Sequence, residues 1–281
     1  MKQDPKTIID INKDPGLHRK PIEFKPAKLP IVIPKFHWKT DKPDARDFIY
    51  KLNTVVPPVT VDLRQLYSTP VEDQGNLGSC TGHAIAEAIE MVDRKNGKNL
   101  ELSRLFIYYY ERLLEGTVNY DNGAYIRDGI KACYTYGAPL ESLWPYNISK
   151  FRVSPSPAAI QDAAKRKVTL YERALDFNAC INALANGYPV IVGFTVYSSF
   201  VSGNWHRTTA NMPYPNTRSE SVLGGHAVLL VGYNNATQRF IVKNSWGTGW
   251  GDRGYFYMPY QVIQNTSMSS DFWVIKSVNN P

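Results

Sequence analysis

Three residues far apart in the chain, Cys80, His226 and Asn244, are of the types that together attack carbonyl groups. A thiol attacks a carbonyl carbon well only as a thiolate, and both a helix N-terminus and a nearby imidazolium lower its pKa. Apolar residues recur at helical spacing after Cys80, so the sequence places this thiol near the N-terminus of a helix. Cys80 is therefore the candidate nucleophile.

His226 is the candidate base for this thiol. It follows two glycines and opens an apolar run, so its ring can project from the end of a strand. An imidazole that takes up a proton needs a partner on its second nitrogen, and Asn244 stands at the end of the next apolar run. An anionic intermediate also needs hydrogen-bond donors, which the side chain of Gln74 and the backbone N–H of Cys80 could supply.

The elements that must position these residues divide most of the chain into two parts. Helical spacing predicts helices over 80–94, 102–114, 125–136, 157–168 and 178–186. Apolar runs predict strands over 189–196, 225–233, 239–244, 254–258 and 272–276. A helical half, about 72–168, and a sheet-rich half, about 169–281, indicate an α+β fold with a composite site in the cleft between them.

At three places the sequence resembles the papain-like cysteine peptidases. Residues 74–80 read QGNLGSC, like the nucleophile loop of that family. Residues 225–233 read GHAVLLVGY, like its histidine strand, and residues 243–255 read KNSWGTGWGDRGY, like its asparagine motif. The resemblance covers roughly 58–276. It implies a papain-like fold, with a helical left domain, a β-sheet or barrel right domain and the active-site cleft between them.

The resemblance also implies a reaction, the hydrolysis of peptide bonds by an endopeptidase through an acyl-enzyme on Cys80. His226 would be the base and later the acid, Asn244 would orient it, and Gln74 would donate to the oxyanion. Trp246 would shield the hydrogen bond between Asn244 and His226 from water. The implied substrate contacts are Asn122, Gly123 and Ala124 along the substrate backbone, Ser270 and Asp271 near the floor of the S2 pocket, and Gly225 and Trp246.

Two departures from the family pattern surround the nucleophile. Leu77 stands where the family commonly has a disulfide-forming cysteine, and 81–83 read TGH in place of the usual Trp-Ala-Phe. These features resemble the prokaryotic and viral variants of the cathepsin B type. His83 lies one helical turn after Cys80, so it could tune the thiolate or act as a second base, or simply pack within the helix. His206 could approach the leaving group, or be a solvated loop residue.

Residues 1–57, which we call the arm, differ from the peptidase-like domain expected over 58–281. The arm is rich in proline and lysine, and helical and strand periods are weak in it. We expect a propeptide that covers the cleft of a zymogen, as an intramolecular inhibitor, with apolar anchors at 29–34 and 36–38. The alternative is a disordered tail or a targeting segment.

The composition of the chain limits the disulfides, the partners and the location that we expect. The chain has 281 residues, a net charge of +7 and three cysteines, too few for a disulfide framework. Cys133 and Cys180 lie among apolar neighbours and should be core residues. We expect polypeptide substrates, no metal or organic cofactor, no requirement for nucleic acid and no membrane partner. With no signal peptide or transmembrane segment seen, the expected location is cytoplasmic or virion-associated.

Two functions of other classes stay open at this point. An acyl transferase on the same scaffold would pass the acyl group to an amine instead of water. A catalytically silent homologue would use the cleft only for binding, although the complete set of Gln74, Cys80, His226 and Asn244 argues against it.

Overall fold

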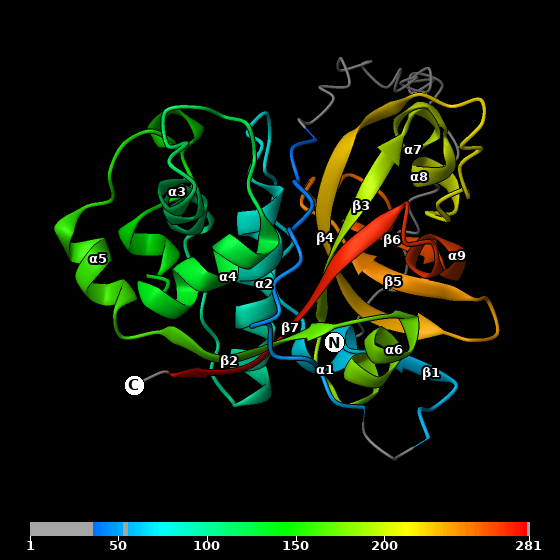
Figure 1. Cartoon of the computed structure of the whole chain (residues 1–281), viewed down its shortest axis with the longest axis horizontal. Helices are drawn as coiled ribbons and strands as arrows, with labels where there is room; N and C mark the ends of the chain where they lie inside the picture. Colours follow the sequence, from blue (N-terminus) through cyan, green and yellow to red (C-terminus); the bar gives the residue numbers. More distant parts are fainter. Residues whose placement is uncertain (1–35, 53–55, 280–281) are drawn as a thin grey trace, which may run out of the picture. The chain divides into compact units, whose positions relative to one another are not determined.

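The computed structural model describes residues 36–52 and 56–279, and these belong to one compact unit that spans 33–281. The expected anchor at 29–34 lies outside the described residues. Helices α2 to α5 gather on one side of this unit and most of the strands on the other, which is a mixed α+β architecture (Figure 1). Among the described residues, no helix is long and apolar enough to cross a membrane.

Helix α2, Cys80–Lys95, is the central helix and begins at the candidate nucleophile. All its residues from Cys80 to Asp93 are buried, because it packs on α3, Arg104–Leu114, and on strand β4 of the sheet. Helix α3 starts where the Ser103 side chain accepts a hydrogen bond from the N–H of Phe106, a standard N-cap. The buried face of α2 thus joins the two parts of the fold.

The other helices of this part are shorter. Helix α4, Ile126–Thr135, is followed by Gly137 at a φ of +85°, a conformation that glycine adopts readily. Helix α5, Pro157–Ala163, ends earlier than the sequence predicts. The prediction of a helix over 157–168 is wrong at its end, because Lys167 and Val168 already pair with strand β7.

The sheet is antiparallel throughout, in the order β2-β7-β3-β4-β5-β6, with β1 paired to β4. Its strands are β1 Thr60–Asp62, β2 Lys167–Ala174, β3 Val190–Tyr197, β4 Val222–Asn234, β5 Arg239–Lys243, β6 Tyr255–Pro259 and β7 Ser269–Asn279. All five predicted strands are present, whereas the three-residue β1 and the longer β2 were missed. The burial of β2 does not alternate regularly, so neither a strand nor a helical period is visible in its sequence.

Short helices connect these elements. They are α1 Arg64–Tyr67, α6 Phe177–Ala185, α7 Ser198–Ser202, α8 Trp205–Thr208, α9 Tyr260–Gln264 and the 3-10 turns η1 Glu141–Leu143 and η2 Ile148–Lys150. Only α6 was predicted.

Two buried ion pairs fix α2, one to α3 and one to the sheet. The carboxylate of Glu90 lies 3.0 Å from the guanidinium of Arg104, and that of Glu87 lies 3.5 Å from the ammonium of Lys243. Lys243 is the last residue of β5 and precedes Asn244. Because buried charges persist only when paired, this contact holds the asparagine end of β5 against the helix that carries Cys80.

Candidate active site

Cys80 and His226 come from elements that pack directly against each other, α2 and β4. Both side chains are buried. The backbone groups of Ala227, His37 and Thr81 hydrogen-bond to the thiol of Cys80, so the sulfur lies beside the residue that follows His226. The structure thus brings the candidate nucleophile to the strand segment that carries the candidate base.

The ring of His226 is oriented through its Nε2 atom, which lies 2.8 Å from Oδ1 of Asn244. The same oxygen accepts the N–H of Ser245 at 2.9 Å, so it is an acceptor and Nε2 carries the proton. Nδ1 then holds a lone pair, and it has no hydrogen-bond partner among the described residues. Trp246 stacks on the ring with centroids 5.1 Å apart, at an interplanar angle of 28°.

Gln74 is buried and is held at both ends of its side chain. Its Oε1 accepts the hydroxyl of Ser245 at 2.7 Å, and its Nε2 donates to the carbonyl of Leu77 at 2.9 Å. Its backbone N–H donates to the carbonyl of Ser245 at 2.8 Å. The loop before Cys80 is therefore tied to the asparagine motif after β5, and the four predicted catalytic residues lie in one connected region.

Arm residues 36–39 cross this region. The N–H of Trp38 donates to the carbonyl of Gly225 at 2.8 Å on one side, and the N–H of Lys39 donates to the carbonyl of Ala124 at 3.1 Å on the other. Both contacts are parallel β-bridges, His37 with Gly225 and Lys39 with Tyr125. The ring of Phe36 lies 5.9 Å from that of His226. The arm thus passes over both candidate catalytic side chains.

Several predicted substrate-binding residues contact the arm. A Cβ atom on Gly123 would lie 1.7 Å from the carbonyl oxygen of His37, so only glycine admits the arm backbone here. The indole of Trp38 fits against Gly225 and against Gly193, where a Cβ would meet it at 2.0 Å. Trp246 contacts the ring of Phe36, with centroids 5.8 Å apart. Asn122 is exposed, and Ser270 pairs with Gly193 within the sheet.

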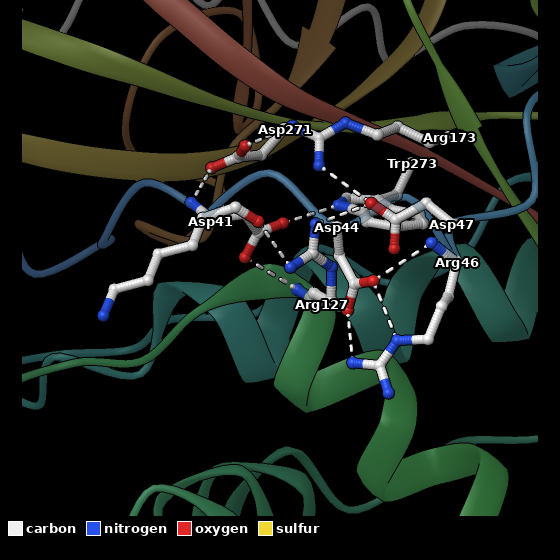
Figure 2. A network of polar contacts seen from close by, with 9 residues as sticks. Asp41, Asp44, Arg46, Asp47, Arg127, Arg173, Asp271 and Trp273 are labelled. Atoms are coloured by element: carbon white, nitrogen blue, oxygen red, sulfur yellow. Dashed lines mark hydrogen bonds and ion pairs between the residues drawn. The ribbon is translucent and has the colours of Figure 1, made fainter.

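Asp271 binds the arm through a buried polar network (Figure 2). Its Oδ2 accepts the backbone N–H of Asp41 at 2.7 Å, and its Oδ1 pairs with Arg173 at 3.0 Å. The carboxyl group of Asp41 accepts the indole N–H of Trp273 at 2.9 Å and the backbone N–H of Arg127 at 3.3 Å. The predicted floor residue of the S2 pocket is thus bonded to the arm itself.

Asp47 is the second anchor of the arm in this network. Its Oδ2 lies 2.6 Å from the guanidinium of Arg127 and 3.1 Å from that of Arg173. The next residues of the arm pair with the edge strand β2, where Ile49 forms a parallel bridge with Arg173. The arm is therefore held by both backbone and charge over 36–50.

Burial sets the protonation of the candidate pair. Burial raises the pKa of the Cys80 thiol to about 11, and burial lowers the pKa of His226 to about 4 although its bond to Asn244 acts in the opposite direction. Both groups are therefore neutral at physiological pH while the arm is docked.

His83 and His206 both pack against aromatic rings. His83 lies in α2 with its Nδ1 at 3.0 Å from the carbonyl of Ser79, and burial lowers its pKa to about 3. Its ring packs edge-on against Tyr146. His206 lies in α8, stacked on Trp250 with an interplanar angle of 3°, within a cluster of aromatic rings.

Sequence reasoning missed the residues that hold the arm and the nucleophile loop. Asp41 and Asp47 anchor the arm to Arg127 and Arg173, and Tyr146 contacts the loop before Cys80. Charged residues on a proline-rich segment and on a helix face carry no distinctive spacing, so no local pattern could have identified them. In the part of the chain that the structure describes, no group of His, Cys, Asp and Glu is arranged to hold a metal ion.

Comparison with known proteins agrees with this geometry. The family model described as papain family cysteine protease matches residues 57–275. An uncharacterized peptidase C1-like protein of Acanthamoeba polyphaga mimivirus is 39% identical, over 88% of this chain and 88% of its own length. The crystal structure of xylellain, a cysteine protease from Xylella fastidiosa, is 38% identical with a TM-score of 0.81, covering 87% of this chain and 96% of that one.

A ragweed pollen cysteine protease, solved in its proform, is 25% identical with a TM-score of 0.62, over 81% of this chain and 68% of its own. The prediction of a papain-like fold and of a cysteine peptidase is confirmed by these matches, and a viral and a bacterial protein are among the relatives. The chain belongs to the papain family of cysteine proteases.

Proposed function

We propose that this cysteine peptidase is a zymogen in which Cys80, His226, Asn244 and Gln74 are the catalytic set and the arm is its inhibitor. The observation that carries the proposal is the path of residues 36–39. Their backbone is hydrogen-bonded to Gly225 on one side and to Ala124 on the other, directly over the nucleophile. On this proposal, the boundary between the arm and the peptidase domain stays at 57/58.

The chemistry follows from the hydrogen-bond directions. Nδ1 of His226 takes the thiol proton while the sulfur of Cys80 bonds to the scissile carbonyl carbon, whose oxygen becomes an anion. The backbone N–H of Cys80 and an amide N–H of Gln74 stabilise that oxygen. When the intermediate collapses, the C–N bond breaks and the imidazolium gives its proton to the leaving amine.

Water then completes the reaction. His226 removes a proton from the water that attacks the thioester, and the Cys80 sulfur leaves with the acid product released. Asn244 keeps Nε2 protonated throughout, so that Nδ1 alone exchanges protons. We assign endopeptidase activity on polypeptides, the substrate class of the reaction.

The docked arm suits an inhibitor rather than a substrate. The backbone hydrogen bond from His37 presents an N–H to the sulfur, and an N–H offers no electrophilic carbon to attack. Because burial raises the pKa of the Cys80 thiol and lowers that of His226, transfer of the proton from the sulfur to the imidazole is also unfavourable while the arm is docked. Displacement of the arm would admit water and allow the thiolate–imidazolium pair to form.

The experiment compares the full wild-type chain with Cys80→Ser and follows peptide hydrolysis and the mass of the N-terminus. We expect the wild-type chain to gain activity as it acquires a new N-terminus between residues 53 and 59. The Cys80→Ser chain should stay intact and inactive. Hydrolysis by Cys80→Ser at the wild-type rate would overturn the catalytic assignment. Full activity of a wild-type chain that keeps residues 1–57 would overturn the zymogen assignment.

A further inference from the structure

The loop that leads into Cys80 has to hold two groups of the proposed oxyanion site, the side chain of Gln74 and the N–H of Cys80. All three cysteines of the chain are free and buried, so no disulfide fixes this loop. Geometry at an oxyanion site has to be accurate to a fraction of an ångström for full effect. Some noncovalent device must therefore fix the loop.

The hydroxyl of Tyr146 lies where such a device is needed. It donates to the backbone carbonyl of Gln74 at 2.9 Å and lies 2.6 Å from the hydroxyl of Ser79, the residue before the nucleophile. Tyr146 stands between the 3-10 turns η1 and η2, outside the loop itself. One side-chain atom thus ties together the two ends of the loop from Gln74 to Ser79.

The proton positions in this contact follow from the donors available. Tyr146 has a single hydroxyl proton, which goes to the Gln74 carbonyl, so its oxygen accepts the proton of Ser79. Ser79 then has no proton to give to His83, whose Nδ1 lies 3.3 Å from the Ser79 hydroxyl and 3.0 Å from its carbonyl. Nδ1 of His83 must therefore carry the proton and donate to Ser79.

Because Nδ1 of His83 is a hydrogen-bond donor, His83 has no role as a second base. Its Nε2 has a lone pair but is buried with no hydrogen-bond partner among the described residues. The pKa of the ring is lowered to about 3 by burial, so the ring is a neutral donor. The hydrogen bonds therefore run in one direction. His83 donates to Ser79, Ser79 donates to Tyr146, and Tyr146 donates to the carbonyl of Gln74.

We propose that Tyr146, supported by His83, is a positioning residue that fixes Gln74 and Cys80 in the arrangement needed to stabilise the oxyanion. The inference rests on the proposed catalytic set. Asp121 supports the same loop from another side, since its Oδ1 accepts the N–H of Gly78 at 2.9 Å and the hydroxyl of Tyr108 at 2.7 Å.

The test uses Tyr146→Phe, made as the full chain and assayed after the arm has been cleaved off, with Tyr136→Phe treated identically as the matched control. Tyr136 lies in the same helical part, and its hydroxyl makes no hydrogen bond within the described residues. Removing one donor of an oxyanion site typically lowers kcat by about a hundredfold or more, so displacing one should give at least about a tenfold loss. We expect kcat of Tyr146→Phe to fall by that factor, with KM within about twofold.

Two probes separate positioning from a merely structural effect. A peptide aldehyde forms a tetrahedral adduct whose oxygen occupies the oxyanion site, so its affinity should fall by the same factor as kcat. Iodoacetamide alkylates the thiol without forming an oxyanion, so its rate should change by less than about twofold. Equal losses with both probes, or no loss in either, would overturn the proposal.

Further variants keep the outcome decisive if Tyr146→Phe folds poorly. His83→Asn keeps an N–H near the position of Nδ1 and should retain aldehyde affinity, whereas His83→Leu removes it and should not. Gln74→Leu must itself weaken aldehyde binding. If Gln74→Leu binds the aldehyde as tightly as the wild type, the proposed catalytic set fails. If Gln74→Leu binds it weakly but Tyr146→Phe and His83→Leu both behave like the wild type, only the positioning role is rejected.

Discussion

Asp41 is the arm residue whose protonation should decide how firmly the arm holds the cleft. It is 5% exposed, and among the described residues its carboxyl group accepts hydrogen bonds only from neutral donors, the indole of Trp273 and the backbone of Arg127. The guanidinium groups of Arg127 and Arg173 instead pair with Asp47 and Asp271, while Arg46 pairs with Asp44 (Figure 2). Three carboxyl groups face two guanidinium groups, so one proton makes the network neutral, and Asp41 is the group best placed to bind it.

The pKa of Asp41 agrees with this count. Burial, and then the charge of Asp271, raise it from 3.8 to about 7 in the docked arm. Because the docked pKa is above that of a free aspartate, docking takes up a proton between these values. The contribution of Asp41 to docking is thus fully present below about pH 4 and is lost as the pH rises through about 7.

The size of the pH effect on docking follows from the free and docked pKa values of Asp41. Between pH 5 and pH 8 the docking constant should fall about a hundredfold in all, most of it below pH 7, which is about 2.7 kcal/mol. Asp271 acts in the same direction, since burial also raises its pKa. The charged groups around Asp41 and Asp271 include Lys42, Asp44, Arg46 and Asp47 of the arm, Arg127 and Asp128 of α4, and Arg173 of β2.

Hydrogen exchange of the arm amides measures this effect. The amides of Trp38 and Lys39 are bonded to the cleft, so their protection reports docking, and a Cys80→Ser background removes self-cleavage. After correction for intrinsic exchange, we expect protection to fall about a hundredfold from pH 5 to pH 8. Asp41→Asn puts a neutral side chain of the same shape at this position and leaves only the smaller contribution of Asp271, so protection should fall by much less over this range.

Asp44→Asn is the matched control, because Asp44 belongs to the same arm but pairs only with the exposed Arg46 among the described residues. It should follow the unsubstituted arm at every pH. Equal protection at pH 5 and pH 8 in the unsubstituted arm would refute the reasoning, and so would a fall of the same size in Asp41→Asn.

Two further changes test how the cleft is built. Gly193→Ala should place a methyl group where the indole of Trp38 packs. Exchange protection of the arm amides should then fall by about tenfold or more at every pH. Gly249→Ala is the control, because position 249 has open space around it and protection should not change. Asn244→Ala should lower kcat by about tenfold to a hundredfold, because His226 loses the acceptor that orients it, while exchange of the arm amides stays at the wild-type level. Unchanged arm protection in Gly193→Ala, or unchanged kcat in Asn244→Ala, would contradict these assignments.

The sequence predicted the fold and the candidate catalytic region because both depend on local patterns. The helix at Cys80 has a clear apolar period, and the strands that carry His226 and Asn244 are continuous apolar runs. Motifs next to these elements then indicated which side chains meet. Strand β2 was missed because half of its residues are only partly buried, as expected at the edge of a sheet.

The path of the arm could not be predicted for a different reason. Residues 36–50 form only isolated bridges with Gly225, Tyr125 and Arg173, so no period marks their pairing. Their direction, parallel to each partner, depends on contacts with residues more than eighty positions away. The charges that anchor Asp41 and Asp47 are likewise supplied by α4, β2 and β7, and become neighbours only in the folded chain.

On the proposed function, the arm and a substrate compete for the same groups. The carbonyls of Gly225 and Ala124 and the surface beside Gly123 are bonded or covered by residues 37–39, so a polypeptide can use them only when the arm has left. Competition of this kind raises the apparent KM by a factor that the equilibrium constant for arm docking sets, and it leaves kcat unchanged. A proton on Asp41 should therefore act on apparent substrate affinity in the uncleaved chain, whereas loss of the Tyr146 hydroxyl should act on kcat.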